Sequence, residues 1–321
     1  MREAARQDTL KALETLVREK LLAQGVISGA HAVVLRPCHP FSLRGKQRFH
    51  FLIQCSPSGQ IFFLKTVKDA DGTLLCDEFL RKAYVGEQDC PYPLVLVPEF
   101  EALGNRYYIT TFLEGFDLDR LPPGTTERDW MRFADRLLPR LRELEHIHAA
   151  QYSECSGFHS ESCGTVLARK LRERARHPFL SRFPREQVTA AVNEYAAVLS
   201  RSIYSSPTLL HMDIKPANII YDPRTESISI IDFELARFSD LDYGRIQILL
   251  SGINSFAPAY RQILVPRLTR EYPSLEEAEK IPKLQCYLFY QCLCNLIYYY
   301  DHALPCPEQI SVLFDRLLNQ F

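Results

Sequence analysis

Residues 211–218 read His-Met-Asp-Ile-Lys-Pro-Ala-Asn, and residues 231–234, which begin thirteen positions after Asn218, read Ile-Asp-Phe-Glu. The two stretches are joined by a short apolar run at 218–221 and by the alternating, β-branched run Ser-Ile-Ser-Ile-Ile at 227–231. Such runs are typical of strands, and Asp-Pro-Arg-Thr at 222–225 has the composition of a turn. The pattern therefore predicts a hairpin that brings Asn218 and Asp232 together, although fourteen positions separate them.

The polar residues at the ends of this hairpin are the set that a phosphoryl-transfer site needs. Asp213 can accept the proton of an attacking hydroxyl. The amide oxygen of Asn218 and the carboxylate of Asp232 can hold Mg²⁺, which prefers hard oxygen ligands and keeps some waters. We therefore predict that Asp213 is a catalytic base and that Asn218 and Asp232 are metal ligands.

The two stretches resemble the catalytic and metal-binding loops of the protein-kinase-like superfamily, H-x-D-x-x-x-x-N followed by a D-F-G-type loop. Glu234 stands where protein kinases have glycine, and Asp-Phe-Glu after an isoleucine is similar to the aminoglycoside phosphotransferase and choline kinase branch. Lys215 is instead similar to the lysine of Ser/Thr protein kinases. We expect His211 to brace the loop by hydrogen bonding, and Lys215 to stabilise the phosphoryl group in transfer.

The rest of the chain agrees with the bilobal α+β fold that the resemblance implies. Strand patterns occur at 31–36, 48–54, 60–67, 94–98 and 107–113, with a helix at about 74–86. We expect a five-stranded N-terminal lobe at 1–113 and a mostly helical C-terminal lobe at 114–321. Residues 1–24 mix charges with apolar residues at helical spacing, which predicts an amphipathic helix and not a signal peptide.

Two residues of the N-terminal lobe are candidates for binding nucleotide phosphates. By resemblance, Lys65 corresponds to the third-strand lysine that contacts phosphate oxygens, and Glu78 to the helix glutamate that holds the ammonium in place. The expected glycine-rich phosphate loop is absent, since residues 37–47 contain a single glycine. Backbone N–H groups there could still bind phosphate with help from Ser42, Arg44 or Lys46.

The segment 107–115, Tyr-Tyr-Ile-Thr-Thr-Phe-Leu-Glu-Gly, resembles the hinge between the two lobes. The carbonyl group of Thr111 and the N–H group of Leu113 would then pair with the edge of adenine. The donor would be ATP or GTP, and the sequence does not distinguish between them.

Helical patterns dominate the second half of the chain. A helix capped by Thr125 or Thr126 is predicted to run to about residue 150, with Pro139 kinking or splitting it. Ser274 is a candidate cap for a short helix, and Pro282 suits the first turn of the next. A last helix is expected at 308–319.

About sixty residues, 151–210, separate the long helix from His211. In the aminoglycoside phosphotransferase branch, the corresponding insert is helical and helps to form the acceptor pocket. This insert carries a cluster of basic residues, which favours an anionic or neutral acceptor if it faces the site. Three acidic residues that could attract an amine instead are Glu234, Asp240 and Asp242. These opposite indications leave the acceptor open.

The overall composition is that of an ordinary globular protein. The chain has 321 residues, a net charge of −1 and 46% hydrophobic residues. There is neither a nucleic-acid-reading motif nor an apolar run long enough to cross a membrane. We therefore expect a cytoplasmic protein without nucleic-acid or membrane partners. Nothing in the sequence indicates an oligomeric state.

The leading hypothesis is a Mg²⁺-dependent phosphotransferase that moves the γ-phosphate of ATP or GTP to a hydroxyl of a small molecule, such as an aminoglycoside, an amino alcohol or a sugar. Two alternatives stay open. A protein kinase is favoured by Lys215 and disfavoured by the long insert. A catalytically silent binding or scaffold protein is favoured by the glycine-poor phosphate loop.

Overall fold

The computed structural model describes residues 2–37, 41–43, 46–48, 50–67, 71–84, 90–121, 124–202, 204, 206–254, 258–270 and 272–320, with backbone alone for 2–7, 41–43 and 46–48. The chain divides into two compact units, Met1–Gly115 and Phe116–Phe321. We describe each unit by itself. The division falls two residues beyond the lobe boundary that the sequence suggests.

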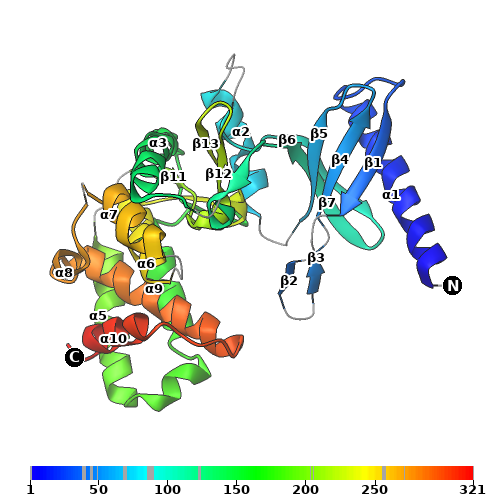
Figure 1. Ribbon diagram of the computed structural model, residues 1–321. Helices are drawn as coiled ribbons and strands as arrows, with labels where there is room; N and C mark the ends of the chain where they lie inside the picture. The colour runs from blue at the N-terminus through cyan, green and yellow to red at the C-terminus, as the bar shows by residue number, and fades with distance from the viewer. Residues whose placement is uncertain are drawn as a thin grey trace. The chain divides into compact units, whose positions relative to one another are not determined.

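The N-terminal unit is built on an antiparallel five-stranded sheet (Figure 1). In spatial order, its strands are β1 (Ala32–Pro37), β4 (Phe51–Ser56), β5 (Ile61–Thr66), β7 (Asn105–Thr111) and β6 (Val95–Ala102). A separate hairpin joins β2 (Phe41–Leu43) and β3 (Lys46–Arg48). The five strands expected from the sequence are all present, with shifted ends. For example, the fourth strand was expected to end at residue 98, but β6 continues to Ala102. A two-residue turn of Leu103 and Gly104, which have positive φ of 54° and 73°, then leads into β7.

A long N-terminal helix covers this sheet. In α1 (Arg2–Ala23), the buried residues Leu13, Val17 and Leu21 recur every four positions, so they form one face. They belong to the same hydrophobic cluster as Ile53 of β4 and Leu64 of β5. The amphipathic helix predicted from the sequence is therefore confirmed. The structure adds that its apolar face packs against the sheet.

The C-terminal unit is mostly helical. Its helices are α3 (Glu127–Glu145), α4 (Cys163–Arg174), α5 (Arg185–Arg201), α6 (Leu241–Asn254), α7 (Val265–Leu268), α8 (Leu275–Ala278), α9 (Pro282–Asp301) and α10 (Glu308–Leu318). Its strands are β8 (Phe116–Asp117), β9 (Ser153–Glu154), β10 (Gly157–Phe158), β11 (Thr208–Leu210), β12 (Ile219–Asp222), β13 (Ser227–Ile230) and β14 (Arg237–Ser239). The short 3₁₀ and π turns are η1 (Leu118–Arg120), η2 (Pro178–Arg182), η3 (Pro216–Asn218), η4 (Phe233–Leu235) and η5 (Tyr260–Leu264).

The caps predicted for these helices are largely confirmed. Thr126 caps α3 in a reciprocal capping box with Asp129, and Ser274 caps α8 in the same way with Glu277. Pro282 occupies the first turn of α9. Of the two effects predicted for Pro139, a kink or a split, the split is wrong, because one helix runs through this residue. A proline removes one N–H donor, and the buried face of α3 keeps the remaining turns in place.

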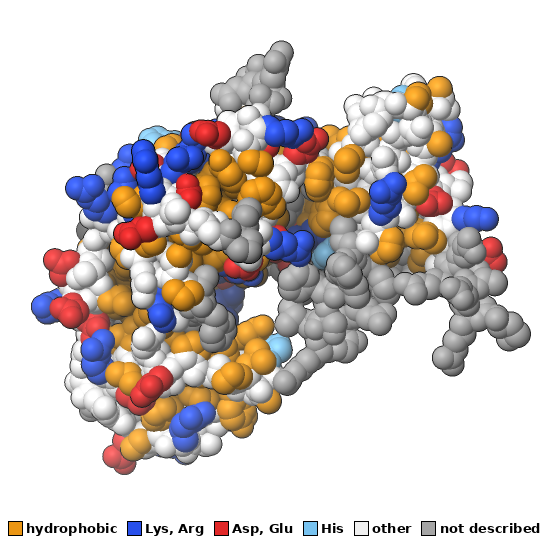
Figure 2. All heavy atoms as spheres, viewed as in Figure 1, with side chains coloured by type: hydrophobic (Ala, Val, Ile, Leu, Met, Phe, Trp, Pro, Cys, Tyr) orange, Lys and Arg blue, Asp and Glu red, His pale blue; other side chains and the backbone are white. Residues whose placement is uncertain are grey.

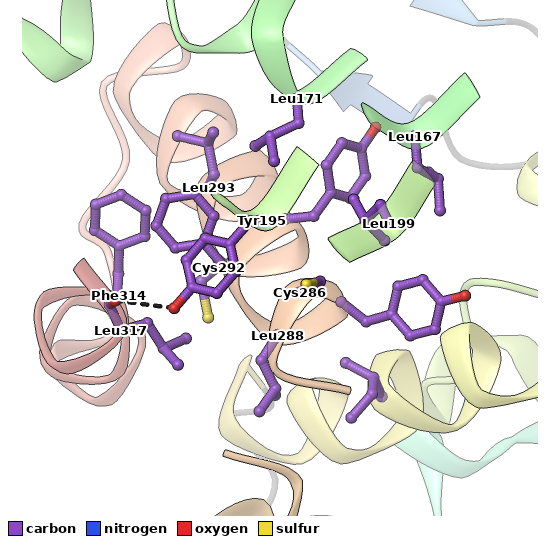
Figure 3. Close-up of a cluster of buried hydrophobic side chains, with 14 of the residues drawn as sticks. Leu167, Leu171, Tyr195, Leu199, Cys286, Leu288, Cys292, Leu293, Phe314 and Leu317 are labelled. Atoms are coloured by element: carbon purple, nitrogen blue, oxygen red, sulfur yellow. Dashed lines mark hydrogen bonds between the residues drawn. The ribbon is translucent and has the colours of Figure 1, made fainter. Parts of the chain in front are cut away.

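The core of this unit lies among helices that are distant in sequence. Figure 3 shows Leu167 and Leu171 of α4, Tyr195 of α5 and Cys286 of α9 among the side chains that meet there. The Tyr195 hydroxyl donates a hydrogen bond of 2.9 Å to the carbonyl oxygen of Leu317 in α10, which satisfies a buried polar group.

The surface is mixed in charge. On the face drawn in Figure 2, basic and acidic side chains are interspersed over the C-terminal unit, as the net charge of −1 suggests. Within the described residues, none of the helices is both long enough and apolar enough to span a lipid bilayer.

Candidate functional site

Two strand pairs hold the loops that carry the predicted site. β11 pairs with β14, and β12 pairs with β13 in the register Ile219↔Ile230. The Ile231 N–H donates a further hydrogen bond of 2.9 Å to the Asn218 carbonyl oxygen, which extends the ladder to the edge of both loops. Asn218 thus lies beside the residue that precedes Asp232, as the hairpin predicted from the sequence requires.

His211 is buried and links the two loops. Its side chain is 3% exposed, and its ring lies edge-on to that of Phe233, at 4.7 Å between centroids. The Asp213 N–H donates to Nδ1 at 3.2 Å, so Nε2 carries the proton and donates to the Ile231 carbonyl oxygen at 2.8 Å. Burial lowers the pKa of His211, which favours this neutral form. The histidine is therefore placed to position both loops.

The Asp213 carboxylate receives hydrogen bonds from two residues of its own loop. Its Oδ2 accepts from the Lys215 ammonium at 2.6 Å and from Asn218 Nδ2 at 2.9 Å. Its Oδ1 accepts no hydrogen bond from the described residues. One oxygen is thus held in place while the other remains available to a hydroxyl, which is the arrangement that a catalytic base needs.

Asn218 presents an oxygen. Its side-chain N–H groups donate to the carbonyl oxygen and to the carboxylate of Asp213, both at 2.9 Å. With the nitrogen side fixed in this way, Oδ1 faces away from Asp213. Asn218 is 4% exposed, so its orientation is well constrained.

Two residues of these loops have left-handed backbone conformations. Met212 has φ of 65°, and Asp232 has φ of 67°. Residues other than glycine rarely adopt such angles, and the strain they carry concentrates at functional sites. At Asp232 the unusual angle redirects the chain at the end of β13, directly before η4.

The donor set suits Mg²⁺. Asn218 Oδ1 and the Asp232 carboxylate are hard oxygen ligands, and this ion takes its other ligands from water and phosphate. Among the described residues, no group of three or more His, Cys, Asp or Glu could hold a metal. The residues at hand therefore fit an ion shared with a phosphate ligand better than a fully protein-coordinated metal.

Two further carboxylates near the catalytic loop were not foreseen. β8 pairs with β12 in the register Ile220↔Asp117, which brings Asp117 and Asp119 to this side of the unit. Burial raises the pKa of Asp119, a repulsion from Asp117 adds to the rise, and the Lys215 ammonium opposes it. The Asp-Leu-Asp sequence is a weak signal by itself, because its closeness to Lys215 depends on the β8–β12 pairing and on the contact of η1 with η3.

In the N-terminal unit, Lys65 lies on β5 opposite Tyr108 and is 8% exposed. Glu78 lies on α2 (Gly72–Ala83), where its exposed carboxylate accepts a hydrogen bond of 2.7 Å from the Lys82 ammonium. The structure therefore pairs Glu78 with Lys82, one helical turn away, and does not bring it to Lys65. Its neighbour Asp77 faces the sheet and accepts a hydrogen bond of 2.7 Å from the Val95 N–H.

The predicted hinge residues lie at the end of β7. The Thr111 N–H donates to the Leu94 carbonyl oxygen at 2.9 Å, and the Thr111 hydroxyl accepts from the Leu94 N–H at 3.0 Å. The Leu113 N–H makes no hydrogen bond within the described part of the chain. That N–H is thus available to a ligand. The side chain of Ser42 lies outside the described residues.

The acidic residues expected to attract an amine are paired with cations or buried, and Arg245 lies 3.6 Å from Asp242. The Lys283 ammonium lies 3.2 Å from the Asp240 carboxylate and 2.9 Å from that of Asp242. Glu234 is 4% exposed. The sequence placed Lys283 more than forty positions from Asp240, so their pairing could not be foreseen from it.

Comparison with known proteins gives the family. Residues 77–277 match the phosphotransferase enzyme family (APH). The chain belongs to the phosphotransferase enzyme family. The matched region covers most of the chain and includes every residue of both loops described above. No curated protein is a significant match to the sequence.

Solved structures with the same fold include other phosphotransferases. The aminoglycoside phosphotransferase APH(4)-Ia is 17% identical with a TM-score of 0.66, covering 95% of this chain and 98% of its own. A thermostable mutant of it in ternary complex with AMP-PNP and hygromycin B is 16% identical with a TM-score of 0.66, covering 96% and 98%. An ethanolamine kinase from Plasmodium vivax is 13% identical with a TM-score of 0.54, covering 93% and 84%. The predicted kinase-like α+β fold is confirmed.

Proposed function

We propose that this member of the phosphotransferase enzyme family transfers the γ-phosphate of ATP or GTP to a hydroxyl group of a small molecule in a Mg²⁺-dependent reaction. One observation carries the proposal: Asp213, Lys215 and Asn218 form a single hydrogen-bonded group, and the β12–β13 ladder brings the Asp232 loop to its edge. The AMP-PNP and hygromycin B bound to the relative of similar fold support a nucleotide donor and a small acceptor.

In the proposed reaction, Asp213 orients the acceptor hydroxyl and takes its proton. The acceptor oxygen forms a bond to the γ-phosphorus, and the bond from that phosphorus to the bridging oxygen of the nucleotide breaks. The nucleoside diphosphate leaves. Lys215 stabilises the charge on the transferring group, and His211 keeps the loop in place.

Nucleotide binding is assigned to the remaining predicted residues. Asn218 and Asp232 would hold Mg²⁺, which neutralises phosphate charge when bound. Lys65 would contact the phosphate oxygens as a point charge, and the N–H of Leu113 with the carbonyl of Thr111 would pair with the adenine edge. Glu78 is not included, because the structure pairs it with Lys82.

The insert supports a small-molecule acceptor over a protein substrate. The insert contains α4 and α5, which are packed into the core of the C-terminal unit through Leu167, Leu171 and Tyr195. A silent scaffold has no physical need for the buried, neutral His211 or for the paired Asp213 and Asn218.

A thermal-shift titration tests nucleotide binding. With Mg²⁺ present, ATP or GTP at 100 times its dissociation constant should raise the free energy of unfolding by about 2.7 kcal/mol. Removing Mg²⁺ with a chelator should reduce this stabilisation. If neither nucleotide stabilises the protein with Mg²⁺, the phosphotransferase proposal is wrong and a silent scaffold is favoured.

Replacing the base tests the chemistry. Asp213→Asn should lower kcat by at least about 100-fold, because the amide cannot accept the proton, while nucleotide affinity changes little. Asp315→Asn, an exposed change of the same kind on α10, should leave both values as in the wild type. Wild-type turnover in the Asp213 variant would rule out the assigned base.

A further inference from the structure

A second charged cluster lies in the C-terminal unit, outside the two loops. It consists of Lys170 and Arg174 on α4, Arg237 on β14 and Glu154 on β9, and we call it the Arg174–Arg237 cluster. These residues come from three separate segments, two of them in the insert. None of them has a role in the proposed reaction so far.

One carboxylate serves two of these cations. Lys170 donates a hydrogen bond to Glu154, and an Arg237 nitrogen lies 3.6 Å from the other Glu154 oxygen. Glu154 is 13% exposed and Arg237 is 17% exposed, so the group is largely shielded from water. His159 lies 3.9 Å from the same carboxylate and would add positive charge if protonated.

Arg174 makes no ion pair within 4 Å with an acidic residue among the described residues, and the Glu154 carboxylate acts on it only at longer range. Its guanidinium donates a hydrogen bond of 2.6 Å to the Tyr290 hydroxyl and lies 5.1 Å from the centre of that ring. Burial raises the pKa of the Tyr290 hydroxyl and, in the same region, of Tyr243 and Tyr152. The surrounding phenols therefore stay neutral and supply no negative charge.

Three cationic side chains and one carboxylate leave an excess of two positive charges in a half-buried position. Such an excess is unfavourable unless an anion compensates it. A guanidinium has five N–H donors in a planar fork that matches phosphate oxygens, and Arg174 uses one of them on Tyr290. The excess also matches a phosphate monoester, which carries a charge of about −1.5 to −2.

The cluster is connected to the catalytic loops through β14. Arg237 lies opposite Leu210, which directly precedes His211 in the sequence, and it follows Asp232 by five residues. Three residues of chain reach at most about 11 Å and a strand pair adds about 5 Å, so the Cα atoms of Arg237 and Asp213 lie within roughly 16 Å. One phosphorylated small molecule is of a size that can reach from the cluster toward Asp213.

We propose that Arg174 and Arg237, with Lys170, bind a phosphate group that the acceptor already carries. The acceptor is then a hydroxylated small molecule with a phosphate monoester, such as a phosphorylated sugar or polyol. This assignment rests on the proposed phosphotransferase function. The pairing of Asp240 and Asp242 with Lys283, and of Asp242 with Arg245 at 3.6 Å, agrees with it, because carboxylates that already have cationic partners are less available to a cationic acceptor.

Anion binding can be measured without turnover. Titration calorimetry compares the affinity of the protein for inorganic phosphate with its affinity for chloride at the same ionic strength. The wild type should bind phosphate, and Arg174→Gln should weaken binding at least tenfold. Arg172→Gln is the matched control, since Arg172 is an exposed residue of the same helix and its loss changes net charge equally. Arg174→Lys, which keeps the charge and loses the fork, should bind with intermediate affinity. Absence of phosphate binding by the wild type, or equal weakening in the Arg172 control, would overturn the site.

A second experiment tests whether the bound phosphate belongs to the acceptor. Turnover is measured with pairs of acceptors, in which each sugar or polyol is supplied once with and once without a phosphate monoester. The wild type should prefer the phosphorylated member at least tenfold in kcat/KM. Arg174→Gln should lose this preference through KM for the acceptor, with KM for the nucleotide unchanged. Phosphate binding without any preference within the pairs would overturn the acceptor assignment, leaving free phosphate as the ligand.

These two arms separate the failure of this inference from that of the proposed function. Phosphate binding in a protein that Mg²⁺ and nucleotide do not stabilise would uphold the anion site and refute the transferase. Turnover of amino alcohols by a protein that does not bind phosphate would uphold the transferase and refute the anion site.

Discussion

His211 illustrates how a single residue organises this site. A neutral imidazole with one accepting and one donating nitrogen joins the backbone of both loops, at Asp213 and at Ile231. A protonated imidazole has two donors and could not accept from the Asp213 N–H. The structure of the loops therefore depends on the protonation state of a buried side chain.

The stability of the protein should consequently depend on pH through His211. Burial lowers its pKa in the folded chain below the ordinary value of about 6.5, so the unfolded chain takes up the proton first. The stabilising contribution is complete above pH 6.5 and is lost as the pH falls below it, by up to about 1.4 kcal/mol per unit. Denaturant unfolding from pH 7.5 to 5.5 should show a smaller loss for His211→Gln than for the wild type.

The matched control for this experiment is His146→Gln, which removes an exposed imidazole from the end of α3. It should follow the wild-type pH dependence. Parallel curves for the wild type and the His211 variant would show that His211 does not titrate as inferred.

At the scale of elements, close packing of α4 against α5 fixes the insert. A Cβ added to Gly164 of α4 would lie less than 3.0 Å from the Leu199 carbonyl oxygen and from the Tyr204 ring. The carbonyl belongs to the backbone of α5 and cannot move aside cheaply. Glycine is thus required here by the approach of two helices and not by its own backbone angles.

Gly164→Ala should destabilise the protein by about 2 kcal/mol. Alanine gains up to about 1 kcal/mol in helix propensity, but overpacking against a fixed carbonyl costs about 1–3 kcal/mol or more. Denaturant unfolding measures the difference. Gly29→Ala, where an added Cβ meets nothing within 4 Å, is the control and should change stability by less than about 1 kcal/mol. Equal stability of the two variants would contradict the packing argument.

For the whole molecule, the charge balance decides solution behaviour. The 38 basic and 39 acidic residues nearly cancel, and they are interspersed on the face drawn in Figure 2. Charge therefore contributes locally, as in the Arg174–Arg237 cluster, and supplies almost no long-range field. Selectivity for the proposed phosphorylated acceptor would therefore depend on such local groups.

The near-zero net charge also predicts a solubility minimum close to the isoelectric point of about 6.8. Precipitation by polyethylene glycol, measured from pH 5.5 to 8.5, should require the least polymer near that pH. Added salt should flatten the curve, because it screens the repulsion on either side. A steady rise or fall through pH 6.8 would show that specific contacts, and not net charge, control association.

The local patterns were sufficient for the parts of the structure that are close in sequence. The apolar run at 218–221, the turn at 222–225 and the β-branched run at 227–231 predicted the β12–β13 hairpin, and with it the approach of Asn218 to the Asp232 loop. The strands of the sheet, the caps at Thr126 and Ser274 and the amphipathic α1 followed from periodicity and composition. Each of these features depends on the backbone geometry of a short segment. The side chains of that segment determine this geometry.

Only the tertiary structure decided which charges meet. It joined Lys283 to Asp240 and Asp242 and brought Asp119 near Lys215, whereas Glu78 is paired with Lys82 within its own helix and not with Lys65. It also set Arg174 against Tyr290, 116 positions away. Long polar side chains can reach several partners, and packing of distant elements selects among them. The residues of the proposed transfer chemistry thus lie in two short loops that local sequence predicts, whereas the surroundings that would select an acceptor depend on the folding of the whole C-terminal unit.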